Sequence, residues 1–89
     1  MKVGDRVMLR SFNGKLVTPR GTRKNENYWL LITFKGTIVR MPNEAKDAID
    51  KKRRLVRFDE NVGTLGLACH NEVENSLWIL EADLEPIDS

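Results

Sequence analysis

Short runs of alternating apolar and polar residues, separated by glycine, proline and asparagine, most strongly limit how this 89-residue chain can fold. In VGDRVMLR (3–10), a Gly-Asp turn precedes an alternation that places Val7 and Leu9 on one face of a strand. YWLLITFKGTIVRM (28–41) is rich in the aromatic and β-branched residues that favour strands, and Gly36 within it indicates a bulge, a bend or a tight hairpin. The first half of the chain therefore predicts β structure.

The second half of the chain continues this pattern. RRLVRFDE (53–60) predicts a strand with Val56 and Phe58 on one face, and LACHNEV (67–73) is a candidate for another strand. SLWILEADLEPI (76–87) predicts a strand, a single helical turn and a last short strand. We expect about five strands in all, and a chain of this length forms one domain.

Two segments interrupt the β pattern. Residues 11–27 contain Asn-Gly, Thr-Pro and Arg-Gly pairs, which predict a long irregular loop with room for a short strand at Leu16 and Val17. Residues 43–52 space their alanines and isoleucine like the apolar stripe of a helix, and Asn43 is a candidate N-cap. We therefore expect one short helix inserted among the strands.

Charge is distributed unevenly, although the net charge is only +2. No lysine or arginine follows residue 60, whereas the same end of the chain contains six aspartates and glutamates. The densest group of cations is Lys51, Lys52, Arg53 and Arg54. It coincides with the end of the predicted helix, where positive charge stabilises the helix dipole. The basic body and the acidic end either pair with each other or face two partners, and the sequence leaves both open.

The order of these elements resembles an SH3-like barrel, in which a small bent sheet closes on itself. Three pieces carry the resemblance: VGDRVMLR, then KGTIVR with RRLVRFD, and LWILEADLEPI. The pattern is similar to that of two groups, the small stromal subunit of photosystem I and the variable chain of ferredoxin–thioredoxin reductase, whose members dock onto redox partners and do not catalyse. The resemblance implies a barrel fold. Relative to it, the helix at 43–52 is an insertion, so we take over the fold and not the redox role.

The sequence offers few residues for metal or nucleophilic chemistry. Cys69 and His70 are the single cysteine and the single histidine, and neighbouring strand residues point to opposite faces. They cannot complete a four-ligand zinc site without carboxylates, and we expect Cys69 to pack in or near the core. No paired carboxylates, glycine-rich phosphate loop or catalytic triad spacing is present. We therefore expect no catalytic residue, no metal and no cofactor.

One class of SH3-like barrel is nevertheless enzymatic. Type II dihydrofolate reductases are tetramers of such barrels, and a Val-Gln-Ile-Tyr strand lines their substrate pore. The corresponding strand here is Leu77-Trp78-Ile79-Leu80, which lacks the glutamine and tyrosine that hold cofactor and substrate. A small oligomeric enzyme of this kind is therefore the third hypothesis for the chain.

The sequence also bears on location. The longest apolar run, residues 28–32, is much shorter than the roughly 20 residues that cross a bilayer, so we expect no membrane partner. The first residues lack the apolar stretch of a secretory leader. A single cysteine cannot form an internal disulfide, which is typical of a reducing compartment, and we expect a cytoplasmic protein.

Cations of the early loop and of the predicted helix end, with one exposed aromatic residue, form the candidate binding surface. They are Arg20, Arg23, Lys24, Trp29, Lys51, Lys52, Arg53 and Arg54. If the two loops converge at one mouth of the barrel, they form a positive patch for an acidic protein or for phosphates. Because Tyr28 and Trp29 are adjacent in an expected strand, they should face opposite ways, which places one of them near the surface.

The most specific hypothesis is a mainly β, non-enzymatic module: one SH3-like barrel domain over residues 1–89 that docks to a larger protein partner. A barrel that binds nucleic acid is the alternative, and a small oligomeric enzyme is the third hypothesis. A basic surface that is simply solvated stays open as well. The sequence does not specify the oligomeric state.

Overall fold

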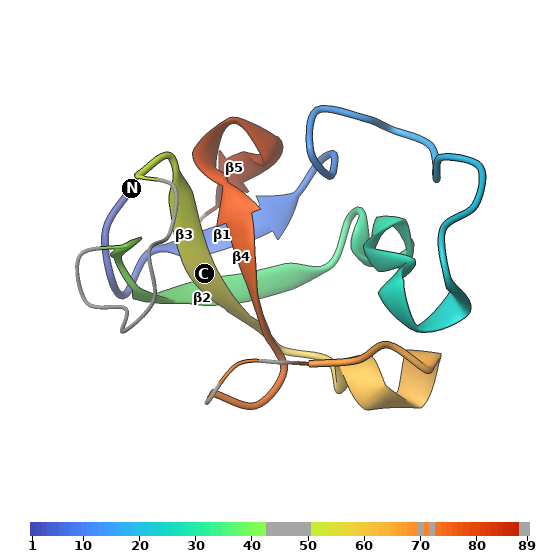
Figure 1. Ribbon diagram of the computed structural model, residues 1–89. Coiled ribbons are helices and arrows are strands. Elements are labelled where there is room, and N and C mark those ends of the chain that lie inside the picture. The colour runs from blue at the N-terminus through green and yellow to red at the C-terminus, as the bar shows by residue number, and fades with distance from the viewer. Residues whose placement is uncertain (43–50, 70, 72, 88–89) are drawn as a thin grey trace.

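The part of the chain that the computed structural model describes, residues 1–42, 51–69, 71 and 73–87, contains five antiparallel strands in one sheet (Figure 1). The strands are β1 (Arg6–Leu9), β2 (Lys35–Arg40), β3 (Arg53–Phe58), β4 (Ser76–Leu80) and β5 (Leu84–Pro86). Their order in the sheet is β4-β3-β2-β1-β5, so the strands from the two ends of the chain pair with each other. The mainly β fold with five strands is confirmed.

Short 3-10 turns connect the strands. They are η1 (Lys24–Glu26), η2 (Tyr28–Leu31), η4 (Val62–Leu65) and η5 (Glu81–Asp83). The last of them joins β4 to β5, which confirms the single helical turn expected before the final strand. No helix in the described ranges has both the length and the apolar character that crossing a membrane requires.

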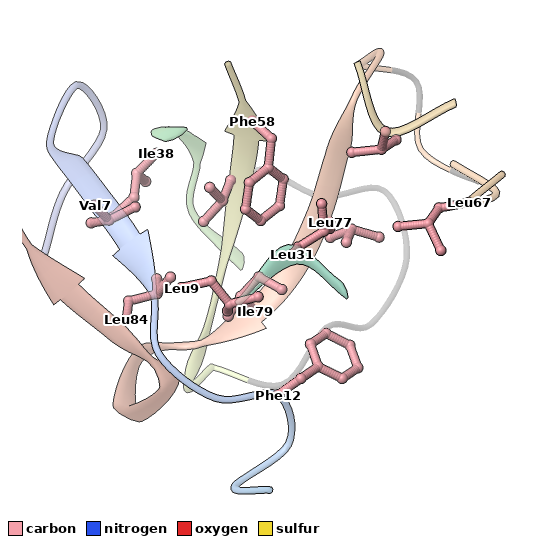
Figure 2. Close-up of a cluster of buried hydrophobic side chains, with 12 residues drawn as sticks. Val7, Leu9, Phe12, Leu31, Ile38, Phe58, Leu67, Leu77, Ile79 and Leu84 are labelled. Carbon is pink, nitrogen blue, oxygen red and sulfur yellow. The ribbon is translucent and has the colours of Figure 1, made fainter. Parts of the chain in front are cut away.

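Alternate residues of the strands point into a common core. Figure 2 shows side chains from all five strands gathered there, together with side chains from the loops. The core consists of Val7, Leu9, Phe12, Leu31, Ile38, Val56, Phe58, Val62, Leu67, Leu77, Ile79 and Leu84. Burying each large aliphatic side chain contributes about 1.5–3 kcal/mol to folding. The sequence alternation in β1 and β3 correctly predicted which face of each strand points into this core.

Gly36 lies where two strands approach unusually closely. An ideal Cβ at this position would be 2.6 Å from the carbonyl oxygen of Arg57 and 2.8 Å from Cγ1 of Val56. The bulge lies elsewhere in β2, between Ile38 and Arg40, where the pairing with β3 shifts. Gly36 is thus explained by the close approach of β3, and not by a bulge or a hairpin turn.

The prediction of strand structure along residues 28–41 is wrong in its first half. Residues 28–31 form η2, and Thr33 has a φ of 81°, which turns the chain before β2 begins. Tertiary packing outweighs β propensity here, because Leu31 is completely buried and the rings of Tyr28 and Trp29 contact Phe12.

Two further strand predictions are wrong. Leu16 and Val17 lie in an exposed bend, and the described residues of 67–73 form no strand. In the second segment, the side-chain amide of Asn71 donates a 2.8 Å hydrogen bond to the carbonyl oxygen of Ser76, a local contact that competes with strand pairing. Residues 43–50 of the predicted helix lie outside the described residues, and Lys51 and Lys52 form a turn.

Candidate partner-binding surface

The cations at residues 51–54 do not act as a group, because the two arginines are used within the fold. One guanidinium nitrogen of Arg53 donates to the carbonyl oxygen of Trp78 at 3.0 Å, and the other donates to Oδ1 of Asn13 at 2.9 Å. Arg53 begins β3, and these contacts join it to β4 and to the early loop. Its role is therefore to connect three segments that are distant in sequence.

Arg54 is engaged even more completely. Its side chain is only 14% exposed, and Nη2 lies 2.7 Å from Oε2 of Glu81. Nη1 donates to the backbone carbonyls of Lys51 and Arg53, both at 2.8 Å. A backbone hydrogen bond joins the same two segments: the amide of Glu81 donates to the carbonyl oxygen of Lys52 at 2.8 Å. Arg54 therefore fixes the turn before β3 against η5.

Lys51 and Lys52 are the exposed members of the group. They lie on a shallow groove of about 670 Å³, together with Arg54 and Glu81. Its remaining lining residues are apolar: Met1, Leu80 and Ala82. The lining therefore combines three apolar residues with two exposed lysines and the ion pair of Arg54 and Glu81. We call this feature the lysine groove.

The early-loop cations do not join the lysine groove. Arg20, Arg23 and Lys24 are exposed, as is Lys15 on the same loop. In Figure 1 the segment 15–24, in lighter blue, lies on the right of the molecule, whereas the turn at 51–54, in yellow-green, lies at the upper left. The structure therefore brings together Lys51, Lys52 and Arg54, but not the two halves of the predicted patch.

Trp29 is half-buried and packs against the core. Its ring lies edge-on to that of Phe12, with centroids 4.9 Å apart, and its indole nitrogen is buried without a hydrogen-bond partner. Tyr28 also contacts Phe12, and its hydroxyl donates to the carbonyl oxygen of Ala68 at 2.7 Å. The expectation that these neighbours face opposite ways is wrong, because they lie in a 3-10 turn and not in a strand. All six aromatic residues are described, and each is buried or half-buried.

The acidic groups of Asp59 and Tyr28 have shifted pKa values for simple reasons. Arg6 forms a two-bond ion pair with Asp59, with Nη1 to Oδ1 at 2.7 Å, and these hydrogen bonds hold the pKa of Asp59 below its ordinary 3.8. Burial raises the pKa of Tyr28, and the nearby Glu26 and Cys69 add to the effect. Neither group lines the lysine groove. Both shifts follow from local packing and pairing.

Cys69 is half-buried and packs against the core, as expected. Its sulfur lies 3.4 Å from the carbonyl oxygens of Val73 and Ser76. His70 lies outside the described residues. Among the residues that are described, no three His, Cys, Asp or Glu side chains come together as a metal site would require.

Sequence reasoning missed the residues that complete the lysine groove, above all Glu81. Its partner Arg54 lies 27 positions earlier, so no local pattern indicates the pair. The uneven charge was the available signal, because Glu81 belongs to the acidic end and Arg54 to the basic body.

Comparison of the chain with protein-family models, with curated proteins and with solved structures finds no match.

Proposed function

We propose that the protein is a non-catalytic, SH3-like binding module that docks to a larger protein partner at the lysine groove. The partner would supply a short acidic and apolar segment. The observation that carries the proposal is that Lys51 and Lys52, both exposed, line the same groove as the apolar residues Met1, Leu80 and Ala82. A surface of this kind complements a segment that has both carboxylates and aliphatic side chains.

The contacts of Arg54 support this proposal. Because Arg54 pairs with Glu81, the carboxylate that lines the groove is already matched by a positive charge within the fold, and the exposed Lys51 and Lys52 add further positive charge to the lining. A separate backbone hydrogen bond, from the amide of Glu81 to the carbonyl oxygen of Lys52, also ties the turn at residues 51–52 to η5. A groove with fixed walls costs less conformational entropy when a ligand binds.

Nucleic acid is the alternative ligand, and the exposed cations of the early loop favour it in one respect. Two separated basic groups can contact phosphates on one long strand. However, barrels that bind single strands also stack bases on exposed aromatic rings. Here every aromatic side chain is buried or half-buried, so the observations favour a protein ligand.

A small oligomeric enzyme has the least support. In the strand that would correspond to the reductase pore, Leu77 and Ile79 belong to the core and Trp78 is half-buried. These three side chains offer no carbonyl, carboxylate or hydroxyl group to hold a polar substrate.

An amide-resonance titration with two probes tests the proposal. One probe is a short peptide that alternates aspartate and leucine, and the other is a single-stranded oligonucleotide. We expect the peptide to shift the amides of residues 51, 52, 54 and 80–82. If only the oligonucleotide shifts resonances, and its affinity falls on the order of a thousandfold between roughly 50 and 200 mM salt, the result would instead favour nucleic acid. Absence of any peptide shift at these residues would count against the lysine groove.

A further inference from the structure

The loop between β1 and β2 presents the two most exposed large apolar side chains of the described residues. Leu16 is 72% exposed and Val17 is 76% exposed, whereas Val3, Leu30 and Leu65 are all below 50%. Leu16 and Val17 are adjacent, and in Figure 1 their segment arches away from the sheet at the upper right. Single exposed aliphatics are common, but an adjacent protruding pair is a candidate interaction site.

The loop is held firmly just before this pair. Phe12 is buried, and its backbone exchanges hydrogen bonds of 2.9 and 3.0 Å with Lys15. Asn13 and Gly14, between them, have φ values of 51° and 76°, which is the left-handed conformation of a tight hairpin turn. The chain therefore leaves the core at Phe12, reverses, and places the next residues outside.

Side-chain hydrogen bonds anchor the loop on both sides of the pair. Asp83 is 2% exposed, and its Oδ1 accepts bonds from the hydroxyl of Ser11 and, at 3.0 Å, from the amide of Gly14. Beyond the pair, the hydroxyl of Thr18 donates to Oδ1 of Asn27 at 2.7 Å. Leu16 and Val17 thus lie between two fixed points.

The charged residues that flank the pair most closely in the sequence have one sign. Lys15 precedes it directly, and the exposed Arg20, Arg23 and Lys24 follow it. No aspartate or glutamate occurs between residues 5 and 26. An apolar pair on a loop rich in cations is a combination that favours binding at the interface of a bilayer with anionic lipids.

We propose that this loop, residues 15–24, binds the surface of an anionic lipid bilayer. Leu16 and Val17 would enter the boundary between headgroups and acyl chains, and the four cations would contact the anionic headgroups. A bilayer accepts a protruding apolar pair without a matching cavity, which favours it over a protein ligand. This revises the expectation of no membrane partner, which considered only segments that span a bilayer.

In Figure 1 the loop segment 15–24 and the turn at residues 51–52, which lines the lysine groove, lie on different sides of the molecule. The proposal therefore does not rest on the proposed function, and each can fail without the other. If both hold, the module can contact a membrane and a protein partner at the same time.

Co-sedimentation with vesicles of phosphatidylcholine, with and without phosphatidylserine, tests the proposal. We expect binding only when phosphatidylserine is present, and a loss of about tenfold or more for Val17→Asp. The matched control is Val3→Asp, which makes the same change at a residue 48% exposed, in the segment at the left of Figure 1. It should retain binding. Equal losses in the two variants would overturn the proposal.

Charge reversal provides the second comparison. Arg20→Glu/Arg23→Glu should abolish sedimentation, whereas Lys51→Glu/Lys52→Glu, with the same change in net charge, should retain most of it. Equal losses would mean that net charge alone attracts the protein, which contradicts a defined loop site. If vesicles fail to bind but the acidic peptide shifts the amides of residues 15–24, the loop is a protein-binding surface and the lipid proposal is wrong.

Discussion

The segment 51–54, which leads into β3, and the early loop each concentrate four cations, yet the cations have different roles in the two segments. At residues 51–54, Arg53 and Arg54 are held by contacts with Asn13, Trp78 and Glu81, and Lys51 and Lys52 are exposed. On the early loop, Lys15, Arg20, Arg23 and Lys24 are all exposed. The difference arises because the first group leads into a strand whose neighbours supply acceptors. A dense cluster of positive charge in a sequence does not by itself define a binding surface.

The largest expected effect concerns the anchor of the early loop. Asp83→Ala should lower the free energy of unfolding by about 2–3 kcal/mol, because it leaves the half-buried Ser11 hydroxyl and the Gly14 amide without their charged acceptor. Urea denaturation measures the change. Asp83→Asn keeps one oxygen acceptor and should cost less. If the alanine variant were as stable as the wild type, the loop would not depend on this anchor.

The second effect separates structural from surface cations within residues 51–54. Arg54→Ala should destabilise the protein by about 1–2 kcal/mol, because Glu81 loses its partner and two carbonyls lose a donor. Lys51→Ala should change stability by less than about 0.5 kcal/mol. Denaturation of the two variants side by side provides the comparison. Equal stabilities would show that the arginine is no more structural than the lysine.

The smallest effect extends the comparison to a paired cation on the sheet. Since the Arg6 hydrogen bonds lower the pKa of Asp59, the unfolded chain binds the proton more readily, and the pair stabilises the fold above pH 3.8. This contribution should be lost as the pH falls through the lowered folded pKa. Asp59→Asn removes the titrating group, so its stability should approach that of the wild type at acidic pH. A stability difference that stayed constant from neutral to strongly acidic pH would contradict the assignment.

The sequence predicted those parts of the fold that depend on short-range periodicity. The alternation around Val7 and Leu9, and around Val56 and Phe58, identified the buried faces because strand side chains repeat every two residues. The 3-10 turn between β4 and β5 was also predictable from local pattern. In contrast, β propensity misassigned residues 28–31, where packing of Trp29 on Phe12 outweighs the local preference.

The candidate site was predictable only in part. Lys51 and Lys52 were identified from charge alone, and they do line a groove. The separation of the two cation groups was not predictable, because it depends on where the strands place loops that are distant in sequence. For the same reason, the partners of Arg53 and Arg54 could not be named: Asn13 and Glu81 lie 40 and 27 positions away.

The most direct test of two separate surfaces is the affinity of the aspartate–leucine peptide for two charge-reversed variants. Lys51→Glu/Lys52→Glu and Arg20→Glu/Arg23→Glu change the net charge equally, so any difference between them reports position. We expect the first variant to lose about tenfold or more in affinity and the second to stay within about threefold of the wild type. Equal losses, or a larger loss in the second variant, would contradict docking at the lysine groove.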